Sequence, residues 1–175
     1  MPQSILRRPV VSPILHYDGV CGLCNRLVQF ILLRDPAGWF RFASLQSALA
    51  GRVLARHGMD AADLDTVYVV LNFDGADERL LARSDAVVFI LRHLGAGELR
   101  SAGQPGAAVP TTPTPRAIPP SKSLWRVIGL LLQAMPRGLR DWAYSAVARR
   151  RYRIFGRYDA CPLPTEETRS RFLEL

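Results

Sequence analysis

Short apolar runs alternate with amphipathic helical patterns through the first half of the chain. Each run is bounded by turn-forming residues such as Pro, Gly, Asn and Asp, which is the pattern of a β-strand. The expected strands are 13–17, 39–43, 66–71 and 78–82. The segments between them gather their apolar residues on one side and predict helices. The expected helices are 21–33, 44–58 and 86–94.

The order of these elements predicts a mixed sheet. Crossovers join the first three strands, so at least some of them should pair in parallel. The short turn at 72–75 makes the last two strands an antiparallel hairpin. Residues 1–97 are therefore expected to form one α/β domain, and a hydrophobic content of 49% is enough to give it a core.

A proline-rich tract occupies 98–121 and excludes both a helix and a central strand, so we expect a flexible linker or insertion there. After it, 124–135 and 137–152 have the pattern of two helices. We expect the segment 122–175 to be a helical extension that packs on the core. The alternative is that its first helix, which is apolar and followed by arginines, lies in a membrane interface.

Two cysteines stand where the first strand meets the first helix. The turn Asp18-Gly19 precedes Cys21, and Cys24 lies one helical turn further on. Unpaired N–H groups and the helix dipole favour an anion at a helix start, so the pKa of the Cys21 thiol should be lowered. Cys21 would then be the attacking thiolate, and Cys24 would resolve the mixed disulfide. Motif and element order together indicate a thioredoxin-like α/β fold.

Asp18, three residues before Cys21, is the third candidate site residue. Asp-Gly is favoured in turns and at helix caps, which is the structural interpretation. In the functional interpretation, Asp18 accepts a proton from the dithiol or restrains thiolate formation.

Other interpretations of the CxxC stay open. A zinc or iron–sulfur module would use Cys21, Cys24 and Cys161, although a lone CxxC is only half of a usual zinc site. The chain has three histidines, His16, His57 and His93. No two of them have the spacing of metal ligands. The remaining alternative is a non-enzymatic interaction or membrane-peripheral protein that works through 125–151.

The chain is basic, with a net charge of +8, and Lys122 is its only lysine. Such a charge attracts anionic partners, but no nucleic-acid motif accompanies the arginines, so no nucleic-acid partner is expected. No long apolar stretch follows Arg7 and Arg8 as in a secretory signal, and no run approaches the ~20 residues of a membrane-spanning helix. We therefore expect a cytoplasmic protein whose dithiol is reduced at rest.

The stretch Asp18–Asn25, D-G-V-C-G-L-C-N, resembles the D-G-x-C-x-x-C-N signature of the DCC family of predicted thiol-disulfide oxidoreductases. Further matches keep their order along the chain: Arg34-Asp35, Phe42–Gln46, Ser84–Ala86, Arg151–Arg153, Phe155-Gly156 and Cys161. The resemblance implies a thioredoxin-like fold and thiol–disulfide exchange without a cofactor. It also implies as partners a protein or small-molecule disulfide or thiol, and a reductant or oxidant that recycles the pair.

The sequence differs from thioredoxins before the third expected strand. In thioredoxins a cis-proline precedes this strand and faces the CxxC. No proline stands near Asp65-Thr66, and by analogy Thr66 would take that position. This departure weakens the prediction of general protein-disulfide reduction and slightly favours the metal alternative.

Overall fold

The computed structural model describes residues 12–60, 64–94, 122–159 and 164–174. Its first elements are β1 (Ile14–Tyr17), α1 (Gly22–Arg34), β2 (Arg41–Ser44), α2 (Ala48–Arg56), β3 (Tyr68–Leu71), β4 (Arg79–Ala82) and α3 (Arg83–His93). The described residues form a five-stranded sheet in the order β4-β3-β1-β2-β5. β1 pairs in parallel with β2 and antiparallel with β3. The predicted mixed α/β architecture is confirmed, and the arrangement is consistent with a thioredoxin-like fold.

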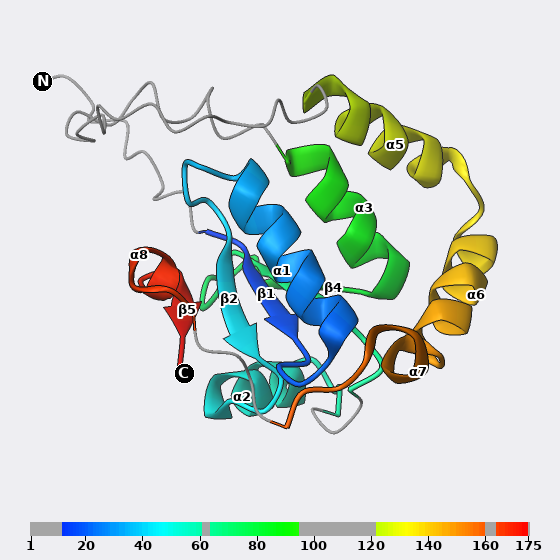
Figure 1. Ribbon diagram of the computed structural model, residues 1–175. Coiled ribbons are helices and arrows are strands. Elements are labelled where there is room, and N and C mark those ends of the chain that lie inside the picture. Colours follow the sequence, from blue (N-terminus) through cyan, green and yellow to red (C-terminus); the bar gives the residue numbers. More distant parts are fainter. Residues whose placement is uncertain (1–11, 61–63, 95–121, 160–163, 175) are drawn as a thin grey trace, which may run out of the picture.

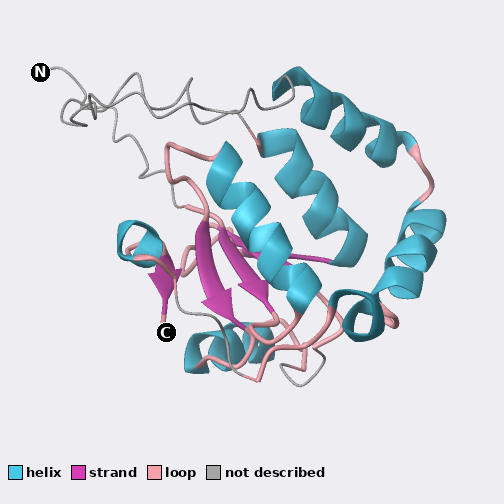
Figure 2. Cartoon of the chain, viewed as in Figure 1, coloured by secondary structure: helices cyan, strands magenta, loops and turns pink. Residues whose placement is uncertain are grey.

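Helices cover both faces of the sheet, so the central strand β1 is buried on both sides (Figures 1 and 2). Alternate β1 side chains point to opposite faces. Leu15 and Tyr17 pack in the main core with apolar residues of α1 and α3. Ile14 packs on the other face with Leu49 and Val53 of α2. The CxxC therefore starts a helix that lies on the larger core.

The C-terminal part of the chain adds α5 (Lys122–Ala134), α6 (Arg137–Ala148), α7 (Arg151–Phe155), α8 (Glu166–Arg169) and the short strand β5 (Phe172–Leu173). α5 lies along α3 (Figure 1). The Trp125 ring meets Phe30 of α1 edge to face, with ring centroids 4.8 Å apart. α6 is held by the Tyr144 hydroxyl, which accepts a hydrogen bond from the backbone N–H of Val67 at 2.9 Å. The division into domain, linker and extension stays a prediction, and the whole expected linker, 98–121, lies outside the described residues.

Two element boundaries differ from the prediction because side chains bind the backbone there. β2 begins at Arg41 and not at Trp39, because the Asp35 carboxylate accepts hydrogen bonds from the N–H groups of Trp39 and Phe40 at 3.1 and 2.8 Å. α2 begins after Ser47 and not at Ser44. Its cap is the Ser47 hydroxyl, which accepts from the N–H of Ala50, whereas Ser44 still belongs to β2.

Further differences lie in the helices and at the C-terminus. α3 begins at Arg83, three residues earlier than predicted. The helix expected over 137–152 breaks at Arg149 and Arg150, and α7 starts after the break. β5, which pairs in parallel with β2, is not predicted by the pattern. A two-residue strand has too few positions to show an alternation. No helix among the described residues is long and apolar enough to cross a bilayer.

Candidate active site

Cys21 lies between the turn that follows β1 and the first residue of α1. Its backbone is extended, with φ −82° and ψ 122°, and it forms the N-cap of the helix. The Cys21 Sγ accepts a hydrogen bond from the backbone N–H of Cys24 at 3.4 Å, as a capping side chain does. The sulfur therefore sits where the free N–H groups of a helix favour negative charge.

Cys21 and Cys24 are both free thiols and form an unequal pair. The Cys24 thiol donates a hydrogen bond to the Cys21 sulfur, which lowers the pKa of Cys21 to about 6; burial opposes this shift, and the charge of Arg151 supports it. The same hydrogen bond, burial and the charge of Cys21 raise the pKa of Cys24. At neutral pH, Cys21 is therefore mainly a thiolate, and Cys24 is a protonated thiol.

Asp18 is fully buried, and each of its carboxylate oxygens has two donors. Oδ1 accepts from the backbone N–H of Val20 at 3.1 Å and from Gln46 Nε2 at 2.9 Å. Oδ2 accepts from the Tyr152 hydroxyl and from Arg151 Nη2, the latter at 3.3 Å. Asp18 thus closes the turn, as expected for Asp-Gly, and also links that turn to the C-terminal part of the chain.

Arg151 is a site residue that the sequence analysis missed. Arg149–Arg151 belong to the predicted helix 137–152, and arginines mostly face solvent, but Arg151 is only 3% exposed. Its guanidinium contacts Asp18 and also Asp65, the latter at 3.1 Å. The helix breaks before Arg151, and α7 directs its side chain inward. The only signal for it in the sequence is its place in the family match at 151–153.

Residues 151–158, which we call the C-terminal strap, run across the start of α1 (Figure 1, the orange segment). The backbone N–H of Gly22 donates to the carbonyl of Gly156 at 3.1 Å. The N–H of Tyr158 donates to the carbonyl of Val20 at 2.8 Å. These bonds hold the strap on both sides of Cys21.

No surface of Cys21 is exposed to solvent, because it packs in the main core and the strap runs across it. Cys21 forms an isolated antiparallel bridge with Arg157 of the strap. A Cβ atom placed on Gly22 would lie 2.1 Å from the carbonyl oxygen of Phe155, which is closer than any real contact. The approach of the strap therefore requires glycine at this position of the CxxC.

Two amides brace the turn before the CxxC. Asn25 Nδ2 donates to the carbonyl oxygens of Gly19 and Cys21 at 2.8 and 3.0 Å. Gln46 donates to Asp18 and accepts from the N–H of Gly19 at 3.2 Å. Both residues belong to segments that matched the family signature, and the structure supplies a physical reason for those matches.

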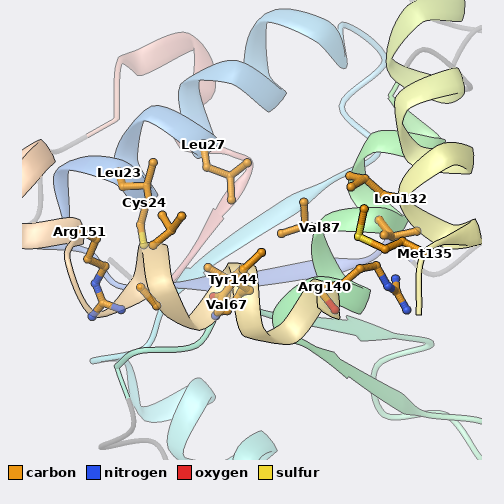
Figure 3. Close-up of a pocket in the computed structure, with 15 residues that line it drawn as sticks. Leu23, Cys24, Leu27, Val67, Val87, Leu132, Met135, Arg140, Tyr144 and Arg151 are labelled. Atoms are coloured by element: carbon orange, nitrogen blue, oxygen red, sulfur yellow. Dashed lines mark hydrogen bonds between the residues drawn. The ribbon is translucent and has the colours of Figure 1, made fainter. Parts of the chain in front are cut away.

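An apolar cavity of about 430 Å³ lies beside Cys24, between α1 and α3 on one side and α5 and α6 on the other. Cys24 and Arg151 line one end, and Leu132, Met135 and Arg140 line the other (Figure 3). Cys21 is not part of the lining. The two cysteines therefore face different surroundings, the strap over Cys21 and the cavity beside Cys24.

The histidines do not join the cysteines. His16 is buried in β1, His57 contacts Glu78 at 2.9 Å, and His93 ends α3. Within the described ranges, no group of three His, Cys, Asp or Glu side chains could hold a metal. Cys161 lies outside the described residues, so the metal interpretation that includes it stays untested. Thr66 is buried two residues before β3.

A thiol with a lowered pKa beside a second thiol at a helix start can carry out thiol–disulfide chemistry. Residues 15–105 match the family model of the DCC1-like thiol-disulfide oxidoreductases, and the chain belongs to this family. The resemblance that the motif indicated is thereby confirmed.

Two curated relatives match along most of the chain. The uncharacterized protein YuxK of Bacillus subtilis is 31% identical over 164 residues, which cover 94% of this chain and 96% of the relative. A DCC family protein of Arabidopsis thaliana, named as chloroplastic, is 31% identical over 151 residues, covering 86% of this chain and 69% of the relative. No solved structure matches the chain significantly.

Proposed function

We propose that the protein is a thioredoxin-like thiol–disulfide oxidoreductase that uses Cys21 and Cys24 as its redox pair. The observation that carries this proposal is the Cys21 sulfur at the N-cap of α1, which accepts hydrogen bonds from the N–H and the thiol of Cys24. Both donors favour the thiolate, which is the nucleophile in disulfide exchange. Membership of the family supports a redox role.

In the reducing direction, the Cys21 thiolate attacks one sulfur of a partner disulfide. The partner S–S bond breaks, its second sulfur leaves as a thiolate that takes up a proton, and Cys21 is joined to the partner. Cys24 then loses its proton and attacks the Cys21 sulfur. The Cys21–Cys24 disulfide forms, the partner leaves as a dithiol, and two electrons have passed to it. The reverse sequence oxidises a partner dithiol.

The charges of the site support the second step. Once Cys21 is in a mixed disulfide it no longer carries a negative charge, so one cause of the raised pKa of Cys24 disappears. The positive charge of Arg151 lowers the pKa of both thiols and persists throughout. In this proposal Asp18 is a positioning residue, because its carboxylate holds the turn and Arg151 through four hydrogen bonds.

The strap restricts which partners can react. A disulfide has to approach the Cys21 sulfur directly, but Cys21 is fully buried and the strap runs across it. In our proposal the strap moves aside for exchange and returns afterwards. Its backbone hydrogen bonds to Val20 and Gly22 are the contacts that break. The partners proposed are a protein or small-molecule disulfide or thiol and a recycling reductant or oxidant.

The test is a redox titration of the full chain in a Cys161→Ser background. Protein equilibrated in graded dithiol/disulfide buffers is trapped with an alkylating reagent, and the labels on each cysteine are counted by mass spectrometry. We expect Cys21 and Cys24 to be oxidised together in one two-electron transition. A Cys24→Ser variant should accumulate a mixed disulfide at Cys21, whereas Cys21→Ser should not. The proposal fails if no Cys21–Cys24 disulfide forms at any ratio of dithiol to disulfide in the buffer.

A further inference from the structure

The entire net charge of the chain arises from one segment. Residues 122–158 contain nine of the 23 cationic residues but only one of the 15 acidic residues, Asp141. The segment therefore carries the whole net charge of +8, and the rest of the chain is balanced. It consists of α5, α6 and the strap, so the positive charge is concentrated on one part of the molecule.

The outer face of α5 is apolar although it is exposed. Its inner face packs on the core through Trp125 and through Gly129, whose missing side chain leaves room for Arg92 of α3. Four large aliphatic side chains point outward: Leu124, Val127, Leu130 and Leu131 are 44%, 49%, 53% and 67% exposed. At 3.6 residues per turn these four span an arc of about 120°. A water-facing helix normally has polar residues there.

α6 follows α5 on the same side of the molecule (Figure 1), and it also has exposed apolar side chains. Leu139 is 50% exposed and Trp142 is 66% exposed. Arg149 and Arg150, both exposed, follow directly after the last residue of α6. The exposed apolar side chains of α5 and α6 are therefore followed by a pair of exposed cations.

We propose that the outer face of α5 and α6 binds the surface of an anionic phospholipid bilayer. Aliphatic side chains and Trp142 would enter the interface, while Arg149 and Arg150 would contact lipid phosphates. A second copy of this chain is disfavoured as the partner of this face, because binding would bring two segments of net charge +8 together. Nucleic acid is disfavoured as the partner because the exposed side chains of this face are mainly aliphatic. This inference does not depend on the thiol chemistry.

The same helices form the outer wall of the cavity beside Cys24, where Leu132 and Met135 contribute to the lining (Figure 3). Binding through this face would therefore bring the cavity, and the redox pair next to it, close to the bilayer.

The test is co-sedimentation of the full chain with vesicles of phosphatidylcholine alone or with one quarter phosphatidylglycerol. We expect sedimentation with the anionic vesicles and little with the neutral ones. Replacing Arg149 and Arg150 by Gln should weaken binding about fivefold for each arginine. The double variant Leu131→Gln, Trp142→Gln should lose most of its binding to the anionic vesicles. Matched controls are Leu33→Gln, at a leucine of α1 that is 78% exposed, and Arg79→Gln, at an exposed arginine of β4.

The inference is overturned if neutral and anionic vesicles bind equally, or if the face variants bind like the controls. It is also overturned if the chain is a dimer in solution that Leu131→Gln dissociates, since a second copy would then cover the face. Circular dichroism of each variant checks that it is folded. The redox titration in solution should give the parent result for these variants, which separates a failure of this inference from a failure of the proposed function.

Discussion

Arg151 and Asp18 form a buried ion pair between positions 133 residues apart in the sequence. The guanidinium Nη2 lies 3.3 Å from the carboxylate Oδ2, and the side chains are 3% and 0% exposed. The pair joins the C-terminal strap to the turn that precedes the CxxC. A charge left alone in such a place is costly, so the integrity of the redox site depends on the end of the chain.

Removal of one partner of this pair should be strongly destabilising. Arg151→Met is expected to lower the free energy of unfolding by about 3–5 kcal/mol, because the Asp18 carboxylate stays buried without its cation. Adding Asp18→Asn should cost less than the sum of the single changes. Chemical denaturation of the four proteins measures this coupling. Arg52→Met is the control: its side chain is 63% exposed and pairs with Glu174, so it should cost under about 1 kcal/mol. Strict additivity at Arg151 and Asp18 would contradict the expectation.

The reactivity of Cys21 should follow a pKa set by Cys24. In the parent protein, the rate of Cys21 alkylation is expected to reach half its plateau near pH 6. Cys24→Ala removes the thiol that donates to Cys21, so the pKa of Cys21 should rise toward the ordinary value of about 8.5. Cys24→Ser keeps a hydroxyl donor, so the pKa of Cys21 in this variant should lie between its values in the parent protein and in Cys24→Ala. Site-resolved mass spectrometry gives the rates, and an unchanged profile in Cys24→Ala would show that another group sets the pKa.

Gly22→Ala should displace the strap. The added Cβ would meet the Phe155 carbonyl at 2.1 Å, so the strap has to move away. We expect a loss of about 1–3 kcal/mol in stability together with faster alkylation of Cys21 at pH 8. The matched control is Gly51→Ala in α2, where nothing lies within 4 Å of the new Cβ. That change should stabilise the protein by about 0.5–1 kcal/mol. Parent-like alkylation in Gly22→Ala would mean that the strap does not cover Cys21 in solution.

His16 should make stability depend on pH below neutrality. Burial lowers its pKa from 6.5 to about 4, and neither ring nitrogen has a hydrogen-bond partner in the described part of the chain. The unfolded chain therefore takes up this proton first. The free energy of unfolding should fall as the pH decreases from about 6.5 to 4, by about 3 kcal/mol in total from this residue. Denaturant titrations at several pH values should show a smaller decrease in His16→Leu. If the free energy of unfolding falls equally with decreasing pH in the parent protein and in His16→Leu, this pH dependence does not arise from His16.

Local chemistry accounts for the part of the site that could be predicted. The pattern predicts the first strand at 13–17 and the first helix at 21–33, and these elements are Ile14–Tyr17 and Gly22–Arg34. The Asp18-Gly19 turn and a capping side chain act within a few residues, so the pattern around the CxxC reveals them. The same locality explains why the linear pattern alone is enough to place Cys21 at the helix start.

Contacts between distant segments account for what was missed. Nothing near Arg151 distinguishes it from Arg149 and Arg150, because its role depends on a helix break that brings it to Asp18. β5 likewise depends on a long-range contact: Arg171 lies 2.6 Å from Asp35 beside the two-residue strand. The two members of each pair lie far apart in the sequence, so no local pattern of residues indicates that they will be in contact.

By itself, the sequence determined the alternation of strands and helices, the family, and the position of two thiols at a helix start. Turn preferences, capping and hydrophobic period are properties of neighbouring residues, which a linear pattern records. Only the tertiary structure decided that the strap buries Cys21, that Arg151 is part of the site, and that a cavity lies beside Cys24. These features depend on where separate elements meet, because burial and ion pairing are set by packing between segments far apart in the chain.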